Sequence, residues 1–418
     1  AYLRGVTKWA ERIEHPARAP QLMARAFQAM RSGRQGPVAL EAPWDFFTRS
    51  ARVTQLAPLP PWPDPAPDLE RIEEAARLLA EARAPMIMVG GGAMHCGREV
   101  LELAEILGAP VVSFRSGRGV VSDEHPLALT LAGARHLWRE TDVLLGVGSR
   151  VEVPSMRFHH TPEGQRLIRI DIDPAEMRRL APAVPIVADA RAAVSALIQA
   201  LLRLPASNRR GAERVNRAKS QALADIEKVQ PQVAYLKAIR AVLPRDGFLV
   251  DEISQMGFTS WYAFPVFEPR TFVTSGYQGT LGFGFPTALG VKVANPKRAV
   301  VSMTGDGGFM FAAQELATAV QHRIGVVTLV FNNSCYGNVR RDQMEGFGGR
   351  VIGADLLNPD FMKLAEAFGV NACRAHSPDE LRVALERALQ TDAPALIEVP
   401  VAPGSETSPW EFIRLPSA

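Results

Sequence analysis

The feature that most limits the fold of this chain is a repeated alternation of short apolar segments with amphipathic stretches. One set of apolar segments spans residues 85–89, 110–114, 142–147 and 166–172, and a second set spans 248–250, 299–303, 326–331 and 395–399. Nearly continuous apolar strands separated by helices are typical of parallel sheets whose two faces are covered by helices. We therefore predict an α/β fold with two parallel-sheet domains.

The remaining segments suggest how these domains are joined. A chain of 418 residues is too long for one ordinary domain. Residues 68–200 and 231–418 are predicted to be the two α/β domains, and residues 201–230 a connecting helix. The proline-rich stretch 51–67 is predicted to be an extended, stiff linker. Residues 1–50 hold one predicted helix and one predicted strand, too little for a core, so we expect them to be the C-terminal end of a preceding domain.

Composition narrows the functional classes. Apolar residues make up 47% of the chain and charged residues 22%, which is ordinary for a soluble protein. The net charge is only +3 and the basic residues are dispersed, so no nucleic-acid partner is predicted. No apolar run has the roughly 18–20 residues of a membrane helix. Cys96, Cys335 and Cys373 are too far apart for a zinc motif or a disulfide framework, which favours a cytoplasmic protein.

Two polar motifs follow neighbouring apolar segments of the second domain. Asp306 lies between Gly305 and Gly307, and Asn333 follows the next predicted strand. Adjacent parallel strands bring their carboxyl ends to one sheet edge, where ligands bind. A carboxylate and an amide oxygen suit Mg²⁺, which also binds phosphate oxygens. Gly307 and Gly308 would let backbone N–H groups approach an anion at the start of a helix. Either motif alone is more typical of a simple turn, but together they predict a magnesium and phosphate site.

These motifs resemble a known cofactor signature. The run Gly305-Asp306-Gly307, followed by Asn332-Asn333, is similar to the motif of thiamine-diphosphate (ThDP)-dependent enzymes of the acetolactate synthase and benzoylformate decarboxylase group. The resemblance implies that Asp306, the Asn333 side chain and the Cys335 carbonyl bind Mg²⁺. It also implies a set of diphosphate-binding residues: Gly305, Gly307, Gly308, Tyr336 and Gly337.

Two further segments resemble the same family. In the segment 274–286, Leu281 stands where the family has a bulky residue that bends ThDP, and the Gly279 carbonyl would accept a hydrogen bond from the aminopyrimidine. In the segment 250–256, Ser254 and Gln255 would donate to phosphate oxygens. Glu252 is open to two interpretations, a group facing the substrate cavity or a solvated loop charge.

The family's catalytic glutamate has no counterpart in this sequence. In the family this residue belongs to the front of the pyrimidine-binding domain and is supplied by a partner subunit. Glu14 and Glu41 lie too late in the pattern, so we assign no catalytic residue. We expect the front of that domain to precede Ala1, and the shared site implies a homodimer or homotetramer. This chain alone is expected to be inactive.

The central domain raises the question of a second cofactor. Gly90, Gly91 and Gly92 follow a predicted strand, but their spacing does not fit the dinucleotide motif G-x-G-x-x-G. In acetolactate synthases this domain holds FAD. Here the segment 131–139 replaces the expected glycine-rich segment, which disfavours FAD. Arg150 and the strand-end residues around Asp171 are predicted to be structural.

The resemblance leaves the reaction open. Carboligation of 2-oxoacids, as in acetolactate synthases, fits the overall organisation best. Asp251-Glu252 and the run 333–337 look more like benzoylformate decarboxylase, so a decarboxylase or lyase is the alternative. A non-catalytic ThDP-binding protein and an NAD-dependent oxidoreductase are more distant alternatives.

Overall fold

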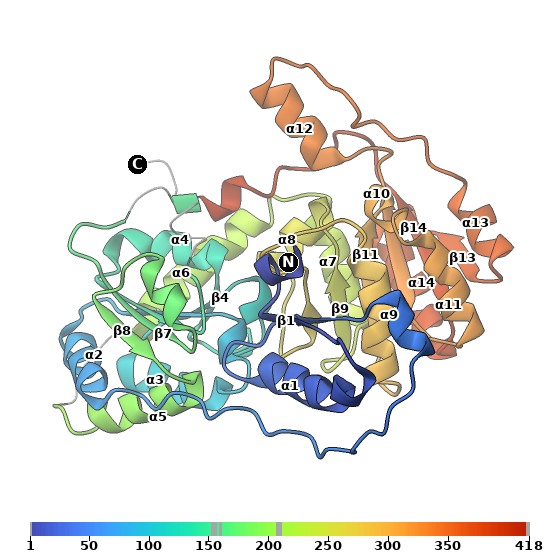
Figure 1. Ribbon diagram of the computed structural model, residues 1–418. Helices are drawn as coiled ribbons and strands as arrows, with labels where there is room; N and C mark the ends of the chain where they lie inside the picture. The colour runs from blue at the N-terminus through green and yellow to red at the C-terminus, as the bar shows by residue number, and fades with distance from the viewer. Residues whose placement is uncertain (1, 152–156, 159–160, 206–210, 415–418) are drawn as a thin grey trace.

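A computed structural model describes residues 2–151, 157–158, 161–205 and 211–414 of the chain. These residues form two parallel α/β units and a smaller N-terminal unit, arranged as Figure 1 shows. Both large sheets have six strands and are parallel throughout. The predicted α/β fold with two parallel sheets is thereby confirmed.

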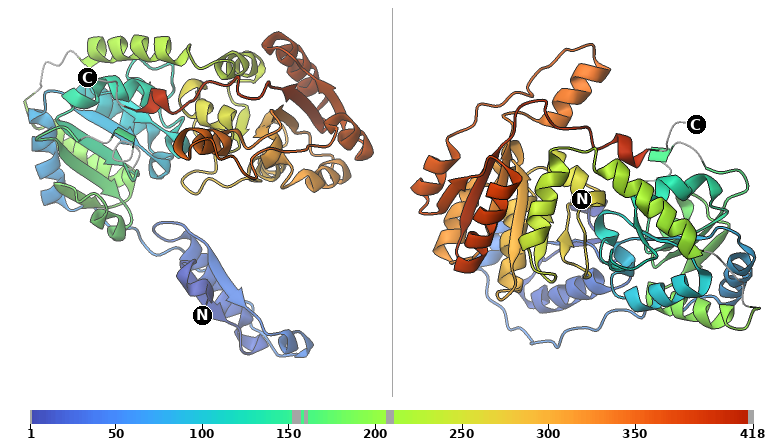
Figure 2. Two further views of the ribbon diagram at one scale, coloured as in Figure 1. Left: turned by 90° about the horizontal axis from the view of Figure 1, so that it is seen from above. Right: turned by 180° about the vertical axis from the view of Figure 1, so that it is seen from behind.

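The N-terminal unit contains one strand more than predicted. Strand β1 (Trp9–Arg12) pairs in parallel with β2 (Val38–Glu41), and α1 (Ala19–Arg31) connects them. The left view of Figure 2 shows this unit projecting away from the two larger ones. Short 3-10 turns complete it: η1 (Tyr2–Gly5), η2 (Pro16–Arg18) and η3 (Trp44–Thr48). Residues 51–67 have no regular secondary structure, in agreement with an extended linker.

The central sheet has the strand order β5-β4-β3-β6-β7-β8. The order reverses between β3 and β6, because the chain builds first one half of the sheet and then the other. Its strands are β3 (Met86–Val89), β4 (Val111–Ser113), β5 (Ala128–Thr130), β6 (Val143–Val147), β7 (Arg166–Asp171) and β8 (Val184–Val187). Its helices are α2 (Leu69–Glu81), α3 (Gly97–Leu107), α4 (Leu131–Leu137) and α5 (Ala190–Leu201). Short turns are η4 (Gly91–Ala93), η5 (Arg115–Gly117), η6 (Trp138–Glu140) and η8 (Pro174–Arg178).

Two segments join the central core from outside the predicted central domain. The expected connecting segment contains α6 (Gly211–Ile226), whose buried side includes Val215 and packs with α4 in the central core. The end of the described chain also returns to this core, where Phe412 and Ile413 of η10 (Glu411–Ile413) are buried. These contacts join the two large units.

The second large sheet has the order β10-β9-β11-β12-β14-β13, with apolar clusters on both faces. Its strands are β9 (Phe248–Asp251), β10 (Phe272–Val273), β11 (Val300–Gly305), β12 (Val327–Asn332), β13 (Asn371–Arg374) and β14 (Ala395–Pro400). Its helices are α7 (Gln232–Val242), α8 (Gln255–Ala263), α9 (Gly284–Ala294), α10 (Asp306–Phe309), α11 (Leu316–Gln321), α12 (Gly337–Gly346), α13 (Phe361–Ala367) and α14 (Pro378–Thr391).

Among the described residues, no single long helix follows the glycine turn after β11. The chain forms the four-residue α10, the short turn η9 (Ala313–Glu315), and then α11. The N–H of Ala312 bonds to the carbonyl of Phe309 instead of continuing an α-helical ladder. A long helix dipole therefore does not begin at Asp306.

Candidate cofactor site

The candidate site lies at the carboxyl ends of β9, β11 and β12. Asp306 directly follows β11 and Asn333 directly follows β12, and these strands are neighbours in the sheet. The segment after β9 approaches from the other side of β11. The order of the sheet reverses between β9 and β11, and such a reversal opens a crevice at the strand ends of parallel sheets.

A cavity of about 190 Å³ occupies this edge and brings nearly all of the predicted residues together. Of the residues predicted to bind cofactor or metal, Gly279 alone does not line the cavity. It lies on an exposed turn with a left-handed φ of 57°. The predicted residues that line the cavity are Ser254, Gln255, Leu281, Gly305, Asp306, Gly307, Gly308, Asn333, Cys335, Tyr336 and Gly337.

Asp306 is buried, with only 2% of its surface exposed. Its Oδ2 accepts a hydrogen bond from Asn358 Nδ2 at 2.6 Å. Burial raises the pKa of the Asp306 carboxyl, and this hydrogen bond together with the backbone N–H groups of Gly307 and Ser334 opposes that rise. A buried carboxylate of this kind is well suited to bind a cation.

Asn333 faces the cavity from the neighbouring strand end. Its Oδ1 accepts a hydrogen bond from the Cys335 backbone N–H at 3.1 Å, and its Nδ2 donates to Glu406 Oε2 at 2.7 Å. The Cys335 side chain is buried, and burial raises the pKa of its thiol to about 11.

The glycines of the site bring backbone close to its neighbours. A Cβ on Gly307 would lie 2.4 Å from Tyr336 Cε1, and a Cβ on Gly308 would lie 2.8 Å from Glu252 Cγ. Any side chain at these two positions would therefore meet its neighbours, as expected where the backbone itself approaches a ligand.

The site fits a diphosphate and a divalent cation by its chemistry. Gln255 is 4% exposed, and its Nε2 has no hydrogen-bond partner among the described residues. A buried, unpaired N–H donor is costly unless a ligand accepts from it. No cluster of three His, Cys, Asp or Glu side chains suited to a metal occurs in the described ranges. The oxygen set at Asp306 and Asn333, completed by phosphate oxygens, matches the ligands that Mg²⁺ prefers.

Glu252 is not a solvated loop charge, because it is buried and its Oε2 accepts a hydrogen bond from the Gly284 N–H at 2.7 Å. It does not line the cofactor cavity, and the alternative role, a group facing the substrate cavity, stays a prediction. Its carboxylate satisfies the first N–H groups of α9, a position where negative charge is favoured.

Three residues of the site were not predicted from the sequence. Asn358 contacts Asp306, Glu406 contacts Asn333, and Arg341 donates from Nη1 to Gln255 Oε1 at 3.0 Å. Each lies on a segment without a strand-end motif, so no local signal could have found them.

Comparison with known proteins identifies the family. Residues 252–399 match the family described as thiamine pyrophosphate enzyme, C-terminal TPP binding domain, and residues 72–197 match thiamine pyrophosphate enzyme, central domain. A probable acetolactate synthase large subunit from Methanocaldococcus jannaschii is 34% identical over 95% of this chain and 72% of its own length. The chain belongs to the ThDP-dependent enzymes of the acetolactate synthase group.

Other relatives in this ThDP-dependent group carry different names. A probable 2-ketoarginine decarboxylase from Pseudomonas aeruginosa is 33% identical over 94% of this chain and 72% of its own length. A glyoxylate carboligase from Escherichia coli O157:H7 is 30% identical over 96% of this chain and 73% of its own length. Decarboxylases and carboligases are thus both among the relatives of this chain.

A second, larger cavity of about 800 Å³ lies at the carboxyl edge of the central sheet, where Gly90 and Gly92 line it. A Cβ on Gly90 would lie 2.3 Å from the Gly148 carbonyl oxygen, and one on Gly92 would lie 2.8 Å from Gly148 Cα. Close packing of two backbone turns therefore accounts for these glycines without a dinucleotide.

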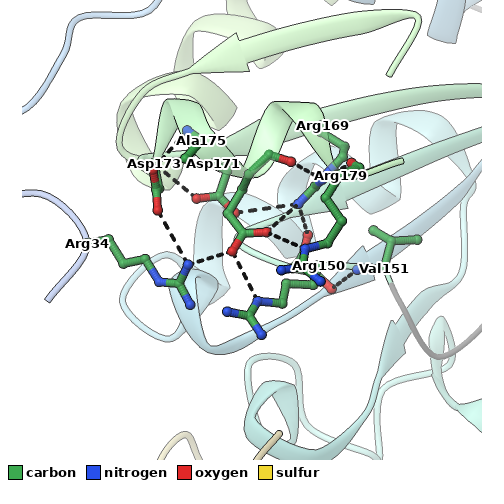
Figure 3. Close-up of polar contacts among 10 residues, drawn as sticks. Arg34, Arg150, Val151, Arg169, Asp171, Asp173, Ala175 and Arg179 are labelled. Atoms are coloured by element: carbon green, nitrogen blue, oxygen red, sulfur yellow. Dashed lines mark hydrogen bonds and ion pairs between the residues drawn. The ribbon is translucent and has the colours of Figure 1, made fainter. Parts of the chain in front are cut away.

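An ionic cluster, drawn in Figure 3, contributes Arg34, Arg150 and Glu176 to the lining of this larger cavity. Glu176 is buried and accepts hydrogen bonds from Arg34 at 2.5 Å, Arg179 at 3.1 Å and Arg150 at 3.2 Å. Arg34 belongs to the N-terminal unit, so the cluster also ties this unit to the central one. Arg150 also lines the cavity, and its structural role stays a prediction.

Within the described residues, no helix is both long and apolar enough to cross a membrane.

Proposed function

We propose that the protein catalyses ThDP- and Mg²⁺-dependent carbon–carbon bond formation on 2-oxoacids, as acetolactate synthases do. The observation that carries this proposal is the meeting of Asp306 and Asn333 at one cavity with the segment that holds Ser254 and Gln255. The 34% identity to a probable acetolactate synthase large subunit supports the proposed carboligase activity.

Different residues of the cavity would bind different parts of the cofactor. Asp306, the Asn333 amide oxygen and the Cys335 carbonyl would hold Mg²⁺. When bound, ThDP supplies a carbanion that adds to a 2-oxoacid carbonyl and an electron sink for the loss of CO₂. Leu281 lines the cavity, where its bulky side chain would contact the cofactor. The diphosphate would be held by Ser254, Gln255, Gly305, Gly307, Gly308, Tyr336 and Gly337.

The proton chemistry at the pyrimidine ring needs a glutamate from the pyrimidine-binding domain. We propose that this group comes from a partner subunit in a homodimer or homotetramer, and that neither Glu14 nor Glu41 replaces it. The described end of that domain, η1 to η3, would be one part of the subunit contact. FAD is not part of the proposal.

A decarboxylase is the second candidate, because a relative 33% identical is named a probable 2-ketoarginine decarboxylase. The two candidates differ in what they release from pyruvate in the presence of Mg²⁺ and ThDP. We expect acetolactate, measured by chromatography after incubation of the protein, including any segment that precedes Ala1, with pyruvate. Acetaldehyde alone would refute carboligation and favour the decarboxylase. ThDP binding without any turnover of 2-oxoacids would favour a non-catalytic protein.

A further inference from the structure

Two side-chain amides line the cofactor cavity, and each is held by a different charged residue. Asn333 donates to Glu406, and Gln255 accepts from Arg341. Both charged residues lie outside the strand-end motifs, Arg341 on α12 and Glu406 in the segment that follows β14. An amide has nearly the same shape when its oxygen and nitrogen exchange places, so its neighbours decide which end faces a ligand.

At Asn333 the neighbours leave only one favourable orientation. A carboxylate offers acceptors and no donor, so Glu406 Oε2 fixes the Nδ2 end at 2.7 Å. The Cys335 N–H donates to the Oδ1 end at 3.1 Å. If the amide turned over, two donors would meet at Cys335 and two acceptors at Glu406. The amide oxygen also accepts a weaker contact from the Cys335 thiol at 3.4 Å, and Mg²⁺ would take the place of that contact.

At Gln255 the orientation is set in the opposite sense. Arg341 offers donors and no acceptor, and its Nη1 lies 3.0 Å from Gln255 Oε1. The Nε2 end is consequently directed away from Arg341 and stays without a partner among the described residues, although it is buried. An unpaired buried N–H that lines a cavity can donate a hydrogen bond to an acceptor on the ligand.

The two charged residues also contact each other. Arg341 Nη2 donates to the Glu406 backbone carbonyl at 2.8 Å, which ties α12 to the segment after β14. We propose that Arg341 and Glu406 act as a pair of positioning residues with opposite effects. Glu406 makes Asn333 present its oxygen to Mg²⁺, and Arg341 makes Gln255 present its N–H to the diphosphate. This inference rests on the proposed function of the cavity as a Mg²⁺–ThDP site.

The two roles predict different losses. Glu406→Ala removes one of the two contacts that fix the Asn333 amide and leaves only the Cys335 N–H, so Mg²⁺ affinity measured at saturating ThDP should fall by about 10- to 100-fold, as for other residues that orient a metal ligand. Glu406→Gln can still accept through its own amide oxygen and should recover most of that loss. In Arg341→Ala the affinity for ThDP at saturating Mg²⁺ should fall on the order of tenfold, with a smaller change in Mg²⁺ affinity.

The experiment uses the full-length protein and measures binding, not turnover. Isothermal titration calorimetry gives the Mg²⁺ affinity at saturating ThDP and the ThDP affinity at saturating Mg²⁺ for each variant. Arg340→Ala and Glu345→Ala are matched controls, because both residues lie on α12 and Arg340 forms an ion pair with Asp355 at the surface. Thermal melting without cofactor shows whether each variant is folded.

The outcomes separate this inference from the proposed function. If the unmodified protein does not bind ThDP with Mg²⁺, the proposed function fails and this inference fails with it. If the unmodified protein binds both, and folded Glu406→Ala and Arg341→Ala variants bind like the controls, the positioning roles are wrong and the proposed function stands. A Glu406→Gln variant as weak as Glu406→Ala would also overturn the role of Glu406 in orienting Asn333.

Discussion

Replacement of Asp306 by Asn should affect the free protein and the cofactor complex in opposite ways. The change preserves the shape of a side chain that is 2% exposed but removes its charge. Burial raises the pKa of Asp306, so the free protein is better suited to a neutral group at this position. The oxygen of the new amide can still accept from Asn358, which lies 2.6 Å from Asp306 Oδ2. The melting temperature without cofactor should therefore be unchanged or higher.

The variant should differ from the unmodified protein in its stabilisation by added ligands. A ligand present at 100 times its Kd stabilises a folded protein by about 2.7 kcal/mol. In units of 150–250 residues each kcal/mol raises Tm by roughly 2–4 °C, so Mg²⁺ with ThDP should raise the Tm of the unmodified protein by roughly 5–10 °C. The Asp306→Asn variant lacks the carboxylate that Mg²⁺ requires, and its Tm should not respond.

Differential scanning calorimetry with and without Mg²⁺ and ThDP measures both effects. Asp246→Asn is a suitable control, because Asp246 is exposed, pairs with Arg298 at 3.4 Å and is absent from the cavity lining. It precedes the amino end of β9, whereas the cavity lies at the carboxyl ends of the strands. A ligand-induced shift in Asp306→Asn equal to that of the control would refute the assignment of the metal site. A Tm without cofactor that falls by many degrees would refute the argument from burial.

Three further predictions concern other parts of the structure. Gly307→Ala would place a Cβ 2.4 Å from Tyr336 Cε1 and should lower the free energy of unfolding by about 1–3 kcal/mol in denaturant titrations. Asp251 is buried with its pKa raised to about 8, so the unfolded chain loses this proton first and stability falls as pH rises from about 4 to about 8. Asp251→Asn can still accept from Trp261 Nε1, so its Tm relative to that of the unmodified protein should increase as pH rises through that window. A difference in Tm that stays constant with pH would contradict the raised pKa of Asp251. Arginine contacts lower the pKa of Glu176 against the effect of burial, so its contribution is present at neutral pH and is lost as pH falls below the ordinary carboxyl range. Glu176→Gln should lower the free energy of unfolding by about 1–3 kcal/mol at neutral pH, which is less than for a fully buried pair because its arginine partners are partly exposed. This difference in the free energy of unfolding should shrink in acid. A difference that does not change with pH would argue against the ion pairs.

Much of the candidate site follows from local sequence. Asp306 and Asn333 each follow an apolar strand, and the parallel geometry brings neighbouring strand ends to one edge. Residues within a few positions of those ends, such as Ser254 and Tyr336, line the same cavity for the same reason. The two parallel sheets were predictable because strands buried on both faces must be apolar along their whole length.

Only the tertiary structure brought in the residues that hold those side chains in place. Glu406 is distant in sequence from Asn333, and Asn358 from Asp306, and no periodic pattern records such a pairing. Glu252 looked like a loop charge because its partner, the start of α9, comes much later in the chain. The sequence by itself indicated which groups could carry the cofactor chemistry, since the end of an apolar strand is a local property. The order of the strands in the sheet is decided by the tertiary structure. The orientation of these groups, and the return of Phe412 to the central core, depend on contacts between distant segments, which form only when the whole chain has packed.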